Sequence, residues 1–325
     1  MTYIMGVDGG GTKTYSVICN EKGERIGYGL AGCGNHQSYG IDEAYLHIET
    51  SIQNALSDAH LKKEDISFVQ FGLAGADRPR DFEILNGALE KLGFEHWEVV
   101  CDTMEGLRIG SSSNTGVVLV CGTGTNCAGR NSVGETTQTG GFGYLYGDTA
   151  GGYAMAQDTF RAAVRSYEFR EVPSLLTQEV PKFFGFHDME ELLNDFLDRE
   201  VTSVPSNLTK LLHEVAEQKD SLAISILEKT GKELGIAAIS VIKKLGKFNG
   251  TIPIVLTGSI LQKGKNKSLL DSLLATVEKE FPDVELVIPK MEPVYGSVML
   301  AMDHLGISVT DDIMKKFEAY GGYEK

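Results

Sequence analysis

The alternation of apolar and polar residues at the start of the chain predicts short β-strands. Three such segments are joined first by a glycine-rich tip and then by a polar turn. They cover Tyr3–Val7, Thr14–Asn20 and Arg25–Gly29. Residues 42–60 and 81–92 then carry apolar positions at helical spacing, and strands are predicted over Phe68–Leu73 and Glu98–Cys101. This order of elements is typical of an α/β domain.

The opening pattern begins again about 110 residues later. A strand at Gly116–Cys121 leads into the tip Gly122–Thr125, and a second strand covers Asn126–Arg130. A polar turn then ends in Gly134-Glu135, just as the first copy ends in Gly23-Glu24. We interpret the two patterns as a duplicated α/β domain that begins with a β-hairpin.

After Gly152 the periodicity becomes mainly helical. Helices are predicted over residues 153–168, 187–200, 206–217, 220–246, 267–281, 295–305 and 311–318. Two strands, Ile252–Leu256 and Val284–Ile288, interrupt this series. We therefore expect domains at 1–114 and 115–325 with a cleft between them, the second domain enlarged by a helical insertion at about 153–246. The terminal helix could pack back on the N-terminal domain.

The composition of the chain disfavours some classes of binding partner. The 325 residues include 30 Lys+Arg and 45 Asp+Glu, and the net charge of −15 disfavours binding to nucleic acid or to an anionic membrane. No apolar run approaches the length of a membrane-spanning helix, and the N-terminus lacks the pattern of a secretion signal. The five cysteines form no C-x-x-C pair, so we expect reduced thiols in a cytoplasmic protein.

The strongest chemical signal is the first hairpin tip. Gly9, Gly10 and Gly11 can expose successive backbone N–H groups to a phosphate, and Thr12 and Lys13 add a hydroxyl and a cation. Asp8 precedes these amides and would repel a phosphate unless a cation lay between them, which makes Asp8 a candidate for the Mg²⁺ side. The alternatives are a purely structural hairpin and a solvated Lys13.

The second tip offers a further set of phosphate ligands. Gly122, Thr123 and Gly124 supply amides and a hydroxyl, and two such tips on duplicated hairpins could hold one phosphate chain. Gly258 and Ser259 lie in a strand-to-helix turn that could face an adenosine or its phosphates. This turn could equally be an ordinary connection.

Asp102 follows the strand Glu98–Cys101, and the carboxyl ends of parallel strands are where ligands bind in α/β sheets. A carboxylate aimed at a substrate hydroxyl is the minimal general base for phosphoryl transfer. An aspartate here could instead cap the following helix. Asp77, in the loop after the strand Phe68–Leu73, is assigned to the substrate.

A glycine-rich and aromatic segment suggests a polyol site. Gly141, Phe142 and Gly143 allow close backbone approach and an apolar face, and Asp148 offers a carboxylate acceptor. Asn35, after Gly32-Cys-Gly34, is a second short polar group on a loop. Each could instead be a turn residue.

Taken together, four motifs resemble those of N-acetylglucosamine kinases in the BadF/BadG-type ATPase group of the sugar kinase/actin superfamily. They are Asp8–Thr12, Cys121–Cys127, Gly141–Asp148 and Thr257–Ser259. The resemblance implies two ribonuclease-H-like, actin-like ATPase domains that bind ATP, Mg²⁺ and an amino sugar. We also expect a homodimer. The resemblance further implies that Asp102 is the catalytic base, that Asn35, Asp148 and the Gly141–Gly143 segment contact the sugar, and that Thr12 and Thr123 contact nucleotide phosphates.

The resemblance has one departure. Members of this group often read Gly-Asp-Glu-Gly-Ser, whereas this chain reads Gly147-Asp-Thr-Ala-Gly151, which removes a carboxylate beside the expected sugar site. N-acetylglucosamine phosphorylated at its 6-hydroxyl is the expected reaction, with glucosamine, N-acetylmuramic acid or another hexose as alternative acceptors. An activator ATPase of a 2-hydroxyacyl-CoA dehydratase and a non-catalytic sugar sensor are further alternatives.

Overall fold

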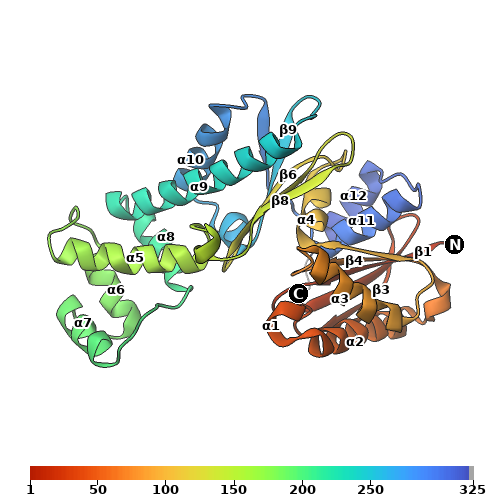
Figure 1. Ribbon diagram of the computed structural model, residues 1–325, viewed down its shortest axis with the longest axis horizontal. Coiled ribbons are helices and arrows are strands. Elements are labelled where there is room, and N and C mark those ends of the chain that lie inside the picture. Colours follow the sequence, from red (N-terminus) through yellow and green to blue (C-terminus); the bar gives the residue numbers. More distant parts are fainter. Residues whose placement is uncertain (322–325) are drawn as a thin grey trace. The chain divides into compact units, whose positions relative to one another are not determined.

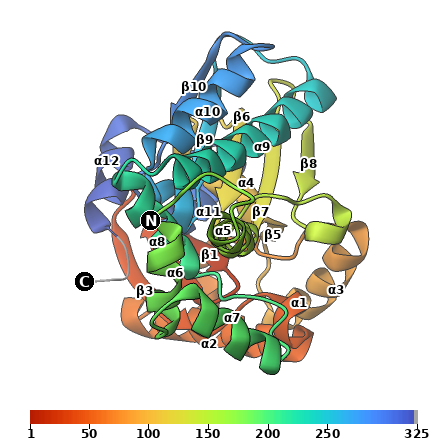
Figure 2. The same cartoon turned by 90° about the vertical axis from the view of Figure 1, so that its left-hand side faces the viewer.

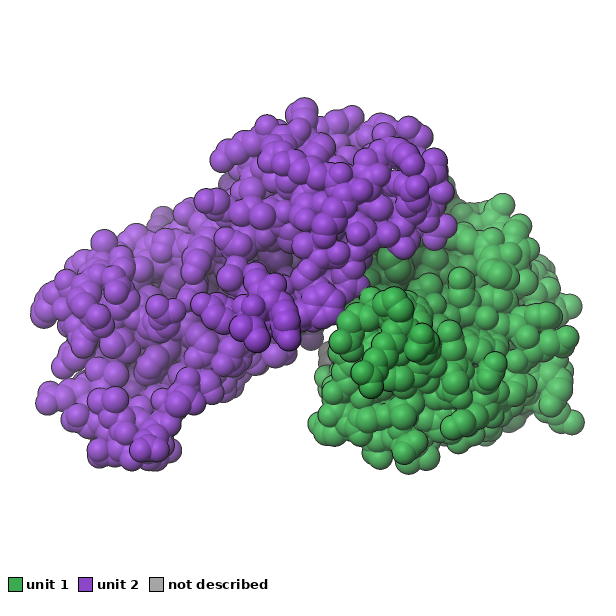
Figure 3. Space-filling model, in the orientation of Figure 1, with its two compact units in different colours: residues 1–118, 289–325 green, residues 119–288 purple. Residues whose placement is uncertain are grey.

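The computed structural model describes residues 1–321, which form two compact units. Unit 1 comprises residues 1–118 and 289–321, and unit 2 comprises residues 119–288 (Figure 3). Unit 1 thus consists of two chain segments, because the helices after residue 289 pack on the N-terminal sheet. The sequence predicts domains at 1–114 and 115–325 and allows the terminal helix to pack back on the first; in the structure all of residues 289–321 belong to unit 1.

Unit 1 is a five-stranded sheet with helices on both faces (Figure 1). Its strands are β1 (Tyr3–Gly9), β2 (Thr14–Asn20), β3 (Arg25–Ala31), β4 (Ile66–Leu73) and β5 (Trp97–Cys101). Its helices are α1 (His36–Tyr39), α2 (Ile41–Ala59), α3 (Pro79–Leu89), α4 (Asp102–Gly110), α11 (Val294–His304) and α12 (Asp311–Tyr320). The order β3-β2-β1-β4-β5 combines an antiparallel meander with parallel β1, β4 and β5.

Alternation along β1 explains the two cores of this unit. Met5 and Val7 face α2 and α3, where they join the core that contains Ile48 and Leu85. Ile4 faces the opposite side and packs with the buried residues of α11 and α12. Because side chains along a strand alternate between faces, Asp8 lies on the same face as Ile4, toward α11.

Unit 2 repeats the sheet and adds a helical bundle. Its strands are β6 (Gly116–Cys121), β7 (Thr125–Arg130), β8 (Thr136–Gly140), β9 (Ile252–Thr257) and β10 (Val284–Val287). Its helices are α5 (Gly152–Tyr167), α6 (Leu176–Phe184), α7 (Met189–Asp198), α8 (Leu208–Glu217), α9 (Ser221–Leu245) and α10 (Lys267–Glu278). Helices α6, α7 and α8 gather beside α5 (Figure 2), which is the helical insertion that the sequence predicts.

The duplication predicted from the sequence is present in the structure. The order β8-β7-β6-β9-β10 in unit 2 is that of unit 1, strand for strand. Asn20 and Asn131 occupy equivalent turns: each side-chain amide donates to a glutamate four residues later, Glu24 or Glu135, at 2.6 and 2.7 Å. Each Asn Oδ1 accepts the backbone N–H of that same glutamate. The fold is therefore two ribonuclease-H-like domains, as expected.

Candidate active site

The first hairpin tip joins β1 to β2 in unit 1. Gly9 is required by close packing, because a Cβ there would lie 2.5 Å from Leu73 Cδ2. Gly11 has open space around it, a Cβ at Gly10 would be in ordinary contact with the Lys13 carbonyl, and none of the three glycines adopts a positive φ. The Gly11 backbone is therefore exposed because it carries no side chain, and not because the tip adopts a left-handed conformation.

Lys13 contacts other residues of unit 1. Its ammonium lies 3.8 Å from Glu292 Oε2, in the segment just before α11, and 5.9 Å from the centre of the Tyr15 ring. Its positive charge lowers the pKa of Asp8, which places Lys13 beside the end of β1. Lys13 is consequently held by unit 1 and is not simply a solvated strand residue.

Asp8 lies among other carboxyl groups, which changes its protonation. Burial and the neighbouring charge of Asp102 raise the pKa of Asp8 to about 7. Glu105, one helical turn after Asp102, is fully buried and faces the same carboxyl group. A Cβ at Gly72, the β4 partner of Asp8, would lie 2.5 Å from Glu105 Cδ, so a glycine in β4 makes room for Glu105.

Asp102 is the first residue of α4 and follows Cys101, the N-cap residue, which makes no side-chain capping bond. The structure thus places Asp102 inside the helix and not at the capping position. The Cys101 thiol contacts Asp102 Oδ1 at 3.3 Å and Asp77 Oδ1 at 3.5 Å, and so brings the two predicted residues together. Burial is the main cause that raises the pKa of Asp102, and the charge of Asp77 adds to it. A raised pKa suits a general base that works near neutral pH.

Asn35 has a structural role in addition to any contact with a ligand. It is the N-cap of α1, and its Oδ1 accepts the backbone N–H of Gln37 at 2.8 Å. A Cβ at Gly75 would lie 2.7 Å from this oxygen, so Asn35 packs against the loop that also carries Asp77. Asn35 and Asp77, both predicted as substrate residues, therefore belong to neighbouring loops of unit 1.

In unit 2 the second hairpin tip and the turn after β9 line one cavity of about 500 Å³. Its walls include Gly122, Thr123, Ser259 and, from α8, His213. Gly258 makes this proximity possible: its φ is +87°, and a Cβ there would lie 2.5 Å from the Cys121 carbonyl oxygen. Gly124 contacts the start of α5, and Tyr153 of α5 donates its backbone N–H to the Thr123 carbonyl at 2.9 Å.

The predicted sugar loop is organised by its own aspartate. Asp148 Oδ2 accepts the backbone N–H groups of Gly141, Phe142 and Gly143 at 3.0, 2.7 and 2.6 Å. The structure therefore brings all four residues together, but it uses one carboxylate oxygen of Asp148 to shape the loop. Phe142 is 47% exposed, which leaves an apolar face available to a ring.

The sequence reasoning missed Glu105, Glu233 and His213. Glu105 bonds to Ser297 of α11, Glu233 of α9 accepts the Thr149 hydroxyl, and His213 lines the cavity beside Thr123. The spacing Asp102-x-x-Glu105 places both carboxyl groups on one helix face and could have pointed to Glu105. All five cysteines are buried free thiols, and no helix of residues 1–321 is both long and apolar enough to cross a membrane.

The chain is similar to known proteins over nearly its whole length. The N-acetylmuramic acid/N-acetylglucosamine kinase of Clostridium acetobutylicum is 26% identical over 93% of this chain and 98% of its own length. The N-acetyl-D-glucosamine kinase of Dictyostelium discoideum is 27% identical over 92% of this chain and 97% of its own length. A Chromobacterium violaceum protein of known structure has the same fold, with a TM-score of 0.68 and 22% identity over 93% of this chain and 99% of that one. The model of the BadF/BadG/BcrA/BcrD ATPase family matches residues 5–301, and the chain belongs to this family.

Proposed function

We propose that the protein transfers the γ-phosphoryl group of ATP to a hydroxyl of an amino sugar, with N-acetylglucosamine and its 6-hydroxyl as the acceptor. The observation that carries this proposal is the position of Asp102 at the end of β5, beside Asp77 and Asp8. The kinase names of the two curated relatives support it, since each covers nearly the whole chain.

Asp102 is the proposed general base. A base must be within hydrogen-bond reach of the hydroxyl whose proton it accepts, and its pKa should lie near the working pH. Burial raises the pKa of Asp102 in that direction. Asp77 and Asn35, which lie in neighbouring loops, would orient the sugar so that the reacting hydroxyl meets the Asp102 carboxylate.

The two hairpin tips are the proposed phosphate ligands. Gly11 in unit 1 and Gly122 and Gly124 in unit 2 have open space where a side chain would be. The N–H groups of Gly10 and Gly122 already bond to the carbonyls of Lys13 and Gly124, so the other amides of the two tips and the Thr12 and Thr123 hydroxyls are the groups proposed to hold the phosphates. Ser259 and the cavity it shares with Thr123 would hold the adenosine. Holding the phosphates through backbone N–H groups stabilises the charge of the transferred group without demanding a large cationic surface.

The residues at the end of β1 fit a magnesium ion. Mg²⁺ prefers oxygen ligands and is usually held by one or two carboxylates together with water and substrate phosphates. Asp8 offers such a carboxylate, and the buried carboxyl group of Glu105 faces it. When bound, the ion would neutralise charge on the β- and γ-phosphates. Asp8 is therefore assigned to the ion, directly or through water.

A coupled ADP-release assay tests the proposal. The wild-type chain is given Mg·ATP and N-acetylglucosamine, glucosamine, N-acetylmuramic acid or glucose, and the product is identified by mass and by phosphorus NMR. Sugar-dependent ADP release with a 6-phosphate product is expected. ATP binding without phosphorylation of any of the four sugars would overturn the proposed function.

The proposal also places the enzyme in the cytoplasm as a homodimer. The five buried free thiols are in keeping with a reducing compartment. Light scattering coupled to gel filtration measures the oligomeric state, and a mass near that of a single 35.3 kDa chain would contradict the dimer.

A further inference from the structure

We propose that Glu233 is a specificity-determining residue that makes this enzyme accept neutral and cationic amino sugars and reject sugars that carry a carboxylate. The inference rests on the proposed function and goes beyond it, because it names the class of acceptor by its charge. It is carried by a small pocket in unit 2 that Glu233 lines together with the sugar loop.

The pocket lies between the β7–β8 hairpin, the end of the sugar loop and α9. Its volume is about 240 Å³, below the range of ~300–1,000 Å³ that drug-sized ligands occupy, and it suits a single monosaccharide. Tyr146 and Ile236 give it apolar surface, and Asn126, Thr149 and Glu233 give it polar groups. A mixture of ring-sized apolar surface and short polar groups is what a pyranose requires.

Two of these polar groups, Asn126 and Glu233, can accept hydrogen bonds from a ligand. Asn126 Oδ1 is buried and has no hydrogen-bond partner among the described residues. A buried acceptor without a partner is costly, and a donor group of a bound sugar would remove that cost. Glu233 Oε2 accepts the Thr149 hydroxyl at 3.0 Å, which fixes the carboxylate at the pocket wall.

The charge of the pocket is negative. Among the described residues that line it, Asp148 and Glu233 are the charged ones. Three loop amides surround one oxygen of Asp148, whereas Glu233 receives a bond from one neutral hydroxyl. Glu233 is therefore the less compensated of the two carboxylates, and it would repel an anionic substituent on the sugar.

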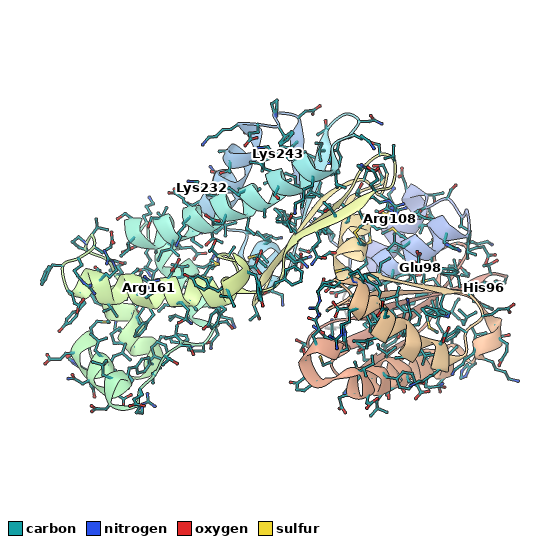
Figure 4. All side chains as sticks on the ribbon, in the orientation of Figure 1. His96, Glu98, Arg108, Arg161, Lys232 and Lys243 are labelled. Atoms are coloured by element: carbon teal, nitrogen blue, oxygen red, sulfur yellow. The ribbon has the colours of Figure 1, made fainter. Side chains whose placement is uncertain are left out.

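Among residues 1–321, Lys244 is a cation that bonds to a residue of the lining. Lys244 Nζ donates to Thr139 Oγ1 at 2.7 Å and contacts the Gln138 carbonyl, so its ammonium is bound to β8. Lys232, the neighbour of Glu233 on α9, is exposed and does not line the pocket (Figure 4). An N–H or O–H donor, or an ammonium group, consequently has a partner in Glu233, whereas the Glu233 carboxylate would repel a carboxylate on the sugar.

The test compares three acceptors that differ in charge. N-acetylglucosamine is neutral, glucosamine carries an amine, and N-acetylmuramic acid carries a carboxylate; kcat/KM is measured for each with Mg·ATP. The variants are Glu233→Gln and the charge reversal Glu233→Lys. Glu228→Gln is the matched control, because it removes the same charge from an exposed position of the same helix. Thermal melts show that each variant is folded.

We expect wild type to favour N-acetylglucosamine and glucosamine over N-acetylmuramic acid by at least about tenfold, an effect of the size that one repelled charge gives. Glu233→Gln should reduce this preference severalfold, Glu233→Lys should reduce it further, and Glu228→Gln should leave it unchanged. The role of Glu233 would be refuted if wild type used N-acetylmuramic acid as well as N-acetylglucosamine, or if folded Glu233 variants kept the wild-type ranking. Either result would leave the proposed kinase function standing. Failure with every sugar would overturn the proposed function as well.

Discussion

Glu105 and Ser297 join α4 to α11 through a hydrogen bond of 2.6 Å between Ser297 Oγ and Glu105 Oε2. Both residues are fully buried. Burial and the neighbouring Asp8 carboxyl raise the pKa of Glu105 well above its ordinary value. Both causes favour the neutral, protonated form of this acid over the carboxylate.

The first prediction concerns the pH dependence of stability. The folded chain holds the Glu105 proton more tightly than the unfolded chain does, so the stabilisation from this group is full below its ordinary pKa of 4.5 and declines as the pH rises toward the raised folded pKa. Glu105→Gln keeps the size of the neutral acid and cannot ionise. The melting temperature of wild type should therefore fall relative to that of Glu105→Gln between pH 5 and pH 8. Parallel melting curves across this range would contradict the prediction.

The second prediction concerns Asp102. Asp102→Asn keeps the size of the side chain but cannot accept a proton, and kcat should fall by ~10²–10⁴-fold, the usual contribution of general acid–base catalysis. Phosphoryl transfer has a loose transition state, so the loss could lie at the lower end. ATP affinity, measured by calorimetry, should change little. A folded variant with wild-type turnover would refute the proposed mechanism.

The third prediction uses two glycines of one hairpin. Gly11→Val adds a side chain to open space at the tip, so the variant should keep its melting temperature and lose nucleotide affinity. Gly9→Ala places a methyl group against Leu73 and should cost ~1–3 kcal/mol of unfolding free energy, the usual cost of overpacking. Calorimetry with ADP and thermal melts on both variants separate binding from stability. Unchanged ADP binding in Gly11→Val would show that the tip is purely structural.

The fourth prediction concerns Thr149. Its hydroxyl lies 3.0 Å from Glu233, so Thr149→Glu would place a second carboxylate beside the first. We expect the ranking among the amino sugars to change more than ATP affinity does, because the cavity assigned to adenosine has a different lining. Equal proportional losses for every sugar would indicate that Thr149 is a structural residue.

Much of the fold could be predicted from the sequence because its signals are local. The repeated hairpins can be predicted because apolar and polar residues alternate along the strands and glycines occupy the tips between them. The carboxylate after β5 can be predicted because it directly follows a recognisable strand. Strand β8 was missed because Thr136–Gly140 is polar and only partly buried, and α6 was missed because Pro181 lies inside it. In both cases packing on neighbouring elements outweighs a weak local preference.

The missed site residues depend on contacts between distant segments. Glu105 gains its role from Gly72 and Ser297, which lie in β4 and α11. Glu233 meets Thr149 across 84 positions of the chain. No periodicity in the sequence reveals such pairings. Asp102 could be predicted because it directly follows a strand that the local sequence identifies.

The two-segment construction of unit 1 has a consequence for synthesis on the ribosome. Val294, Tyr295 and Val298 complete the core that contains Ile4 and Phe68, yet they emerge almost 300 residues after Ile4. Unit 2 is one uninterrupted segment, so all of its residues are made before this part of unit 1 can close. Since domains generally fold as they emerge, the nascent chain should finish its second sheet domain before its first. A released chain of residues 1–288 should accordingly resist protease in unit 2 while residues 1–118 are still cleaved.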